Sequence, residues 1–359
     1  MGSEGYWEPT AWASHIAREI NVARAQAGLP EAVLDRALSE GCLAHCSFLL
    51  ENPDFIAGGL KAHSEDPSLP GYTEAGERAA AKSDISYDAP AHAVNGWLAT
   101  LYHRIPLLRP HMARLGVGAL DYEALRGKAE AGALPQSTRA IVTADLLSGL
   151  DNARRPTDVS AVVVYPADGQ VGVPQHFGSE VPSPLPVGHV AAGFPVTLTL
   201  VGAEAASRVV EVAVDSARLT RVDGKTGKEE PVNCFESWPG RPALEGFSQM
   251  STLCLIPKEP LRGLATYRAS VKLAVDGAAV ERAWSFTTAD DATAKSMMGP
   301  AALYKLRMQE YEKELQAHQA AVARHESVHR ADQADQQAQY ERLLATHAAQ
   351  VADHAARYG

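Results

Sequence analysis

Apolar residues recur at helical spacing in three segments of the N-terminal third of the chain. This spacing predicts amphipathic helices over residues 10–29, 30–52 and 90–104. We expect the first helix to end at Gly28 and the second to begin at Pro30, since proline is favoured at the first position of a helix.

Between the second and third helices the periodic pattern is lost. Residues 63–80, HSEDPSLPGYTEAGERAA, hold two prolines and two glycines, so they are expected to form a loop. Residues 115–120 and 140–147 are short runs rich in small and branched apolar residues, which predicts strands. Helices and short strands therefore alternate over residues 8–159.

The pattern changes near residue 160 to short alternating or β-branched runs, interrupted by Gly, Pro and Asp-Gly. Asp276-Gly277 is a two-residue hairpin signal. Several such runs within residues 160–290 predict a β-sandwich. The expected strands lie in residues 160–170, 194–202, 208–216, 251–257, 266–275 and 279–288.

A third pattern begins after Asp291. From Ala301 onward there is no Gly or Pro before Gly359, and Ala, Gln, Glu, Arg and His dominate. These residues favour one long helix, about 85 Å long at 1.5 Å per residue. A polar helix of this length is not stable as a lone rod, so it implies a partner, most simply a second copy of the chain.

The C-terminal segment also carries an internal repeat. Residues 311–325 align without gaps to residues 340–354, an offset of about eight helical turns, so both copies face nearly the same way. The matching positions step by four and three, as in a coiled-coil seam in which His takes places usually held by Leu. The alternative is chance similarity within an Ala-rich helix. The expected seam consists of Tyr311, Leu315, His318, Val322, His325, Tyr340, Leu344, His347, Val351 and His354.

Composition and charge narrow the classes of function. The chain has 359 residues, too many for one ordinary core, and 46 % are apolar, so two or three folded domains are expected. A net charge of −10 without a block of basic residues argues against a nucleic-acid surface or a polybasic membrane patch. No apolar run approaches the ~18 residues of a membrane span.

The N-terminal stretch MGSEGYWEPTAW lacks the basic and apolar regions of a signal peptide. Two interpretations remain: a cytosolic protein, or the mature chain of an exported protein with a start methionine added. The MGS opening favours the second. We therefore expect an extracellular or cell-surface location.

The four cysteines give two different expectations. Cys42 and Cys46 share a helix face, where helix geometry does not bring them into disulfide contact, so we expect buried free thiols. Cys234 and Cys254 flank a Pro/Gly-rich loop. In an oxidising compartment a disulfide between them would stabilise the fold by roughly 3 kcal/mol. The bridge and two free thiols are equally open for this pair.

Two histidines stand out as candidates for chemistry. Two glutamates, Glu65 and Glu77, lie between His63 and His103 in the sequence. Two imidazoles and a carboxylate are able to bind a divalent metal, or a carboxylate can tune a histidine as a general base. The spacing itself is not that of a metal motif, and the alternative is that each histidine is structural.

The first 160 or so residues resemble the CAP superfamily, also called the SCP or PR-1 type, and especially its secreted bacterial branch. The motifs that carry the resemblance are INVARAQAGLP, KAHSEDPSLPGYT, AGERAA, WLATLYHR and RLGVGAL. It implies an α-β-α sandwich with a cleft lined by two His and two Glu, able in some members to hold zinc or a similar ion. By motif position His63 and His103 resemble the cleft histidines, and Glu77 the first cleft glutamate.

The chain departs from the family pattern at the second cleft glutamate. That residue normally follows the helix tryptophan, here Trp97, by three positions, and Thr100 stands in its place. The set is incomplete, which puts strong metal binding and catalysis in doubt, and Glu65 is a candidate substitute. The resemblance leaves His63, His103 and Glu77 as the residues able to hold a metal such as zinc.

Residues 160–290 are similar to an immunoglobulin-like β-sandwich that accompanies CAP domains in bacteria. The motifs are VVVYPADGQVGVP, SEVPSPLP, GFPVTL and RAWSFTT, and such modules space or adhere rather than catalyse. The expected fold is therefore α+β and multidomain. It comprises a CAP sandwich over residues 8–159, an all-β immunoglobulin-like sandwich over 160–290 and a long helical segment over 291–359.

Three functions remain open. The first is an extracellular, non-enzymatic protein that binds an unidentified ligand or partner through its cleft and forms a homo-oligomer through residues 300–359. It is favoured because no G-x-S-x-G motif is present, and because His45 and Cys46, as helix neighbours, do not face each other. The second is an assembly protein in which the CAP domain is only a scaffold. The third is a metal-assisted hydrolase that uses the cleft histidines and Glu77.

Overall fold

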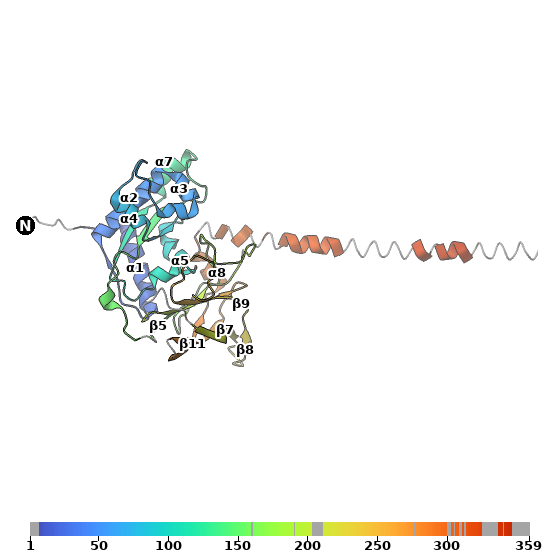
Figure 1. The fold of residues 1–359 in the computed structure, drawn as a ribbon. Helices are drawn as coiled ribbons and strands as arrows, with labels where there is room; N and C mark the ends of the chain where they lie inside the picture. Colours follow the sequence, from blue (N-terminus) through green and yellow to red (C-terminus); the bar gives the residue numbers. More distant parts are fainter. Residues whose placement is uncertain are drawn as a thin grey trace, which may run out of the picture. The chain divides into compact units, whose positions relative to one another are not determined.

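The computed structural model consists of two units, Met1–Tyr304 and Lys305–Gly359 (Figure 1). Within the first unit we call residues 8–159 the N-terminal region and residues 160–290 the β region, following the expected division. The structure describes residues 7–158, 161–189, 191–202, 211–275, 278–299, 303–304, 306–308, 311, 314–324, 337–339 and 341–346.

A four-stranded sheet in the order β1-β3-β4-β2 forms the centre of the N-terminal region. β1 (Val33–Leu34) runs parallel to β3 (Arg114–Leu120), and β4 (Ile141–Asp145) pairs antiparallel with both β3 and β2 (Ser83–Ser86). The helical elements of this region are α1 (Ala11–Gln26), α2 (Arg36–Glu51), α3 (Pro53–Ala57), η1 (Gly59–His63), α4 (Glu74–Ala80), η2 (Pro90–His92), α5 (Ala93–Leu98), α6 (Arg104–Leu107), α7 (Tyr122–Glu130) and η3 (Asn152–Arg154).

Helices cover both faces of this sheet because β3 alternates glycine with larger residues. Gly116 and Gly118 face α2 so closely that a Cβ on either would collide with the α2 backbone. Leu115 and Val117 point to the other face, where they share an apolar core with residues of α1 and α5. The result is an α-β-α arrangement.

Three boundaries differ from the sequence-based predictions. α2 begins after Asp35, whose side chain accepts a backbone N–H of the first turn, and the residues before it form β1. Residues 74–80 of the predicted loop form α4, which Thr73 caps. The third predicted helix ends at Leu98, so that His103 lies in the turn that follows it.

The β region contains two antiparallel four-stranded sheets, in the orders β5-β6-β10-β9 and β12-β11-β7-β8. Leu198 and Leu255 of the first sheet share a core with Tyr267 and Trp284 of the second, so the two sheets bury their apolar faces together. The strands are β5 (Val162–Tyr165), β6 (Val196–Leu200), β7 (Glu211–Val222), β8 (Glu229–Pro231), β9 (Cys234–Ser237), β10 (Thr252–Pro257), β11 (Thr266–Val275) and β12 (Ala278–Thr287).

The expected hairpin turn Asp276-Gly277 lies outside the described residues. The strands on either side of it do pair antiparallel, with Val275 opposite Ala278. The hairpin between β11 and β12 is therefore at the place that the sequence indicates.

The Cys234–Cys254 disulfide is not formed, because all four cysteines are free. β9 and β10 are neighbours, but Cys254 pairs with Ser237 and Cys234 with Pro257. Residues directly opposite share a sheet face, and successive residues alternate between faces. Cys234 and Cys254 are offset by an odd number of positions, so their side chains project from opposite faces and cannot meet.

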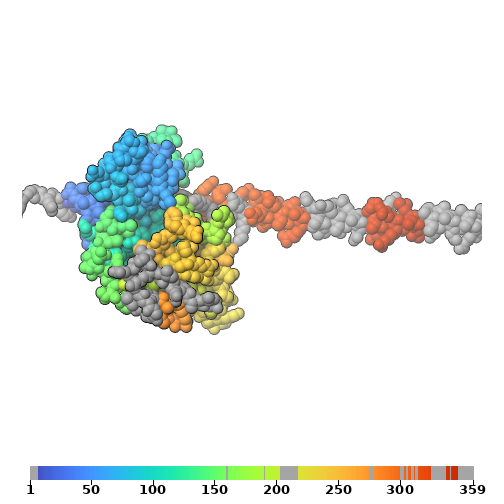
Figure 2. All heavy atoms as spheres, viewed as in Figure 1, coloured from blue at the N-terminus to red at the C-terminus, as the bar shows by residue number. Residues whose placement is uncertain are grey.

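Arg104 ties the N-terminal region to the β region. Its buried guanidinium donates hydrogen bonds to the carbonyl oxygens of Leu98 and Pro195, one in each region. It also lies 5.1 Å from the ring centre of Tyr165 and 4.6 Å from that of Phe194. Burial lowers the pKa of Arg104 to about 10. In the space-filling view the atoms of the two regions are in direct contact (Figure 2).

The C-terminal segment expected at residues 291–359 is divided between the two units. α8 (Asp291–Ser296) belongs to the first unit, and the described residues of the second are helical. One continuous helix over the segment stays a prediction. Of the expected seam, the exposed residues Tyr311, Leu315, His318, Val322 and Leu344 are described. The other seam residues, which lie outside the described residues, are His325, Tyr340, His347, Val351 and His354. No helix of the described part is long and apolar enough to cross a membrane.

Candidate functional site

His63 is half-buried at the end of η1. Its Nδ1 lies 3.2 Å from the carbonyl oxygen of Ala80, the last residue of α4. A carbonyl oxygen only accepts hydrogen bonds, so Nδ1 carries the proton and Nε2 keeps a lone pair. Burial lowers the pKa of His63, and positive charge on His103 and His45 lowers it further.

His103 is held in the turn after α5 by acidic neighbours. Its Nδ1 lies 3.2 Å from Glu180 Oε2 and 3.3 Å from Thr100 Oγ1. Burial alone would lower the pKa of His103. The hydrogen bond that the His103 ring donates to Glu180 and the negative charges of Asp84 and Glu180 outweigh burial, so the pKa of His103 is raised. His103 therefore holds its proton to a higher pH than His63 does.

Asp84, on β2, is a buried acid beside His103. Its Oδ2 has no hydrogen-bond partner among the described residues. Burial raises the pKa of Asp84 from 3.8 to about 7, with the charge of His103 opposing the shift and that of Glu180 adding to it. An ionised carboxylate in this position is costly, which makes Asp84 a titrating group near neutral pH.

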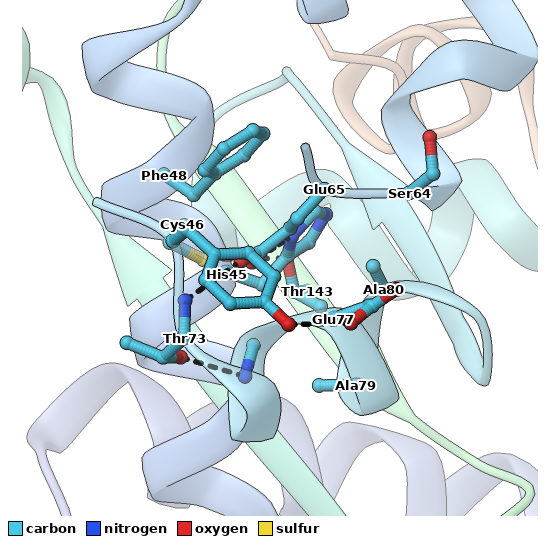
Figure 3. Close-up of polar contacts among 12 residues, drawn as sticks. His45, Cys46, Phe48, Ser64, Glu65, Thr73, Glu77, Ala79, Ala80 and Thr143 are labelled. Atoms are coloured by element: carbon cyan, nitrogen blue, oxygen red, sulfur yellow. Dashed lines mark hydrogen bonds and ion pairs between the residues drawn. The ribbon is translucent and has the colours of Figure 1, made fainter. Parts of the chain in front are cut away.

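Glu65 forms a buried pair with His45 of α2 (Figure 3). His45 Nδ1 lies 2.9 Å from Glu65 Oε1, and His45 Nε2 lies 2.8 Å from the carbonyl oxygen of Ala62. Because that carbonyl only accepts, Nε2 carries a proton and donates it to Ala62, while Nδ1 faces the Glu65 carboxylate. Glu65 Oε2 accepts the N–H of Thr73 at 3.1 Å. The pair therefore fixes α2, η1 and the start of α4 together.

Glu77 lies on the exposed side of α4. Its Oε2 accepts a hydrogen bond from the hydroxyl of Tyr72 at 2.9 Å. Among the interactions of the described residues, Glu77 bonds neither His63 nor His103. The first cleft glutamate of the resemblance is therefore engaged elsewhere in this structure, as is the candidate substitute Glu65.

Three functional neighbours were missed by the sequence reasoning. Glu180 stands in the Pro-rich motif SEVPSPLP, where no local pattern marks it as a site residue, and Asp84 stands in a short run, SDIS, that carries no clear strand pattern. His45 was considered only as a neighbour of Cys46. An apolar helix face with a histidine at its centre is a signal for a buried polar partner, and it could have drawn attention to His45.

The described residues do not complete a metal site. In both His63 and His103, Nδ1 faces an oxygen acceptor and Nε2 is left as the nitrogen that could bind a metal. Imidazoles that bind metals are oriented in this way. Catalytic zinc usually has three protein ligands. Within the described part of the chain no group of three or more His, Cys, Asp and Glu side chains is placed to hold a metal ion.

Three of the four thiols are also unsuited to nucleophilic chemistry. Cys42, Cys46 and Cys254 are fully buried. Burial raises the pKa of all three, to about 12 for Cys46 and Cys254. A thiol that stays protonated and buried does not attack a substrate, so these three cysteines are core residues.

Residues 17–130 match the family model CAP, described as the cysteine-rich secretory protein family. The matched residues include His63, His103 and Glu77, and the match supports the CAP superfamily for residues 17–130. Proteins with this domain are commonly secreted, and the family in general suggests an extracellular ligand-binding role. The β region and the second unit lie outside the match. No curated protein matches the chain.

Proposed function

We propose that the protein is an extracellular, non-enzymatic binding protein of the CAP type, in the secreted bacterial branch. The N-terminal region presents a cleft around His63 and His103 to a ligand or partner. The β region is an immunoglobulin-like sandwich that holds and spaces this cleft. The second unit assembles copies of the chain through the helical seam.

One observation carries this proposal. Apart from Asp84, the acidic and imidazole groups described above are engaged with one another, with a tyrosine hydroxyl or with the backbone, as in Glu65 with His45 and Glu180 with His103. The described residues place no activated nucleophile beside either cleft histidine. What the cleft presents to a ligand is a pair of imidazole nitrogens in a half-buried surface, which suits recognition better than bond cleavage.

The exposed helix of the second unit supports self-assembly. Tyr311, Leu315 and Val322 are 59, 42 and 43 % exposed, and they follow the four-three spacing of a coiled coil. Met308, 40 % exposed, extends the same row by one step toward the N-terminus. A row of apolar side chains on a polar helix has a physical reason to pair with an identical row.

The metal-assisted hydrolase remains the second candidate, because the Nδ1 bonds of His63 and His103 orient both imidazoles as metal ligands are oriented. The third candidate, an assembly protein in which the CAP domain is only a scaffold, is favoured only by the exposed seam. The binding protein and the hydrolase differ in their expected metal content.

Elemental analysis of protein purified without chelators tests the choice. We expect well under one zinc or similar ion per chain, and the same result for His63→Ala and His103→Ala. About one ion per chain in the wild type, lost in both variants, would replace the binding proposal with the hydrolase.

A further inference from the structure

We propose that Glu180 is a positioning residue that the β region supplies to the cleft of the N-terminal region. It fixes both the His103 ring and the turn that carries it, so the cleft is a joint product of two regions. This concerns how the cleft is built, and it holds whether or not the proposed binding function is correct.

The Glu180 carboxylate is fully buried against three consecutive donors. Oε1 accepts the N–H of Leu101 at 2.8 Å, and Oε2 accepts the N–H of Tyr102 at 2.9 Å. Oε2 also lies 3.2 Å from His103 Nδ1. A buried carboxylate is tolerated only with such charge-assisted hydrogen bonds, so these contacts determine the conformation of the turn.

The segment that carries Glu180 is shaped to approach α5 closely. The N–H of Gly178 donates to the carbonyl oxygen of Ala99 at 2.7 Å. A Cβ at Gly178 would lie 2.9 Å from the methyl group of Thr100 and 3.1 Å from the carbonyl oxygen of Gly96. Glycine at 178 and a short side chain at 100 are therefore both required for this approach.

This geometry gives a physical account of Thr100. The resemblance places a glutamate at that position, but a longer side chain there would meet the segment around Gly178. In this chain the carboxylate beside His103 comes instead from Glu180, 79 positions along the chain from Leu101. The missing acid is thus replaced from outside the matched family region.

Arg104, the residue after His103, also connects the two regions. His103 is contacted by Glu180, a residue of the β region. Arg104 extends its guanidinium into the β region and donates a hydrogen bond to the carbonyl oxygen of Pro195. His103 and Arg104 therefore both contribute contacts between the N-terminal region and the β region. A change in the β region at position 180 should therefore alter His103 without any substitution in the N-terminal region.

The test uses the full-length chain and Glu180→Gln, with Glu236→Gln as a control at an exposed carboxylate of the same region. Hydrogen exchange measures the amides of Leu101 and Tyr102, and side-chain ¹⁵N NMR measures the His103 ring. In Glu180→Gln we expect these two amides to exchange at least about tenfold faster, as fits the loss of a charged acceptor. We also expect the His103 ring to lose its fixed Nδ1–H form.

A second variant keeps the carboxylate but disturbs its approach. Gly178→Ala places a methyl group against Thr100, so the same two amides and the same ring should change in the same direction, more weakly. It also replaces Glu180→Gln as the deciding variant if that protein does not fold. Unchanged exchange and an unchanged His103 ring in the folded variant would overturn the proposal. Equal changes in Glu236→Gln would overturn it too, because they would show a general loss of stability.

Discussion

Gly76 shows at the residue scale how tightly the Glu65–His45 pair fills its surroundings. A Cβ at position 76 would collide with Glu65 Oε1 and come within 2.9 Å of Thr73 Oγ1. The carboxylate cannot move away without giving up His45 or the Thr73 N–H. The glycine of the AGERAA motif is therefore required by close packing rather than by backbone conformation.

We predict that Gly76→Ala destabilises the fold by about 1–3 kcal/mol, the usual cost of overpacking a filled site. Gly127→Ala is the matched control, because Gly127 lies inside α7 with open space where its Cβ would be. The control should stabilise the protein by about 0.5–1 kcal/mol. Urea unfolding of both variants gives the two values. Equal and small effects would show that the Glu65 carboxylate is not held where we describe it.

Asp84 gives a pH dependence with a definite sign. Its pKa is 3.8 in the unfolded chain and about 7 in the fold, so between these values only the unfolded chain releases the proton. Stability therefore falls as the pH rises from about 4 to about 7, and the loss is complete above that range.

Asp84→Asn removes this titration, so the variant should match the wild type near pH 4 and exceed it near pH 8. The upper limit of the gain is about 4 kcal/mol, since each pKa unit corresponds to about 1.4 kcal/mol. Denaturant unfolding at several pH values measures both proteins. A difference that stays constant across the range would contradict the raised pKa of Asp84.

The candidate site was only half predictable from the sequence. His63 and His103 stand in motifs with a recognisable position, so they could be singled out. Glu180 and Asp84 could not, because a single acid in a loop or a short strand has no periodicity, and its burial is decided by tertiary packing. Glu65 was taken for a cleft residue because it is two positions from His63, whereas the backbone turns it toward His45.

At the scale of elements, the pairing of β9 with β10 decides whether Cys234 and Cys254 can form a disulfide. The register puts Cys234 and Cys254 on opposite faces of one sheet, although the strands are neighbours. A disulfide would require one strand to slip by an odd number of residues, which would turn its apolar side chains to the wrong face.

We therefore predict four reactive thiols per chain when unreduced protein is unfolded and titrated with a thiol reagent. In the native protein Cys42, Cys46 and Cys254 should react slowly, because they are fully buried. The titration of unfolded protein without reductant is the decisive measurement. Two thiols instead of four would mean that the bridge forms and that the register of β9 differs.

Elements with a long periodic pattern were predicted well, and those made by tertiary contacts were not. α1 and strands such as β10 and β11 follow from their own sequences. β1 is two residues long and exists because it pairs with β3. The helix expected over residues 90–104 is interrupted where Glu180 takes the N–H groups of Leu101 and Tyr102, a partner that local sequence cannot reveal.

At the scale of the whole molecule, reciprocal contacts connect the two regions of the first unit, whereas the described seam residues of the second unit are exposed. Arg104 and Glu180 each reach across the boundary between the N-terminal and β regions. The described helix of the second unit instead presents Leu315 and Val322 to solvent. The exposed Leu315 and Val322 are the residues on which the proposed assembly depends.

The mass of the full-length protein in solution, measured by light scattering at about 10 μM, tests this proposal most directly. We expect the wild type to have a mass that is a multiple of the 38.3 kDa chain. Leu315→Asp with Val322→Asp should give the single-chain mass, because charge on an interface seam is costly. The control Gln316→Asp with Ala323→Asp adds the same charge one position away and should leave the mass unchanged. A wild type that has the mass of one chain, or equal masses for the two double variants, would contradict assembly through the seam.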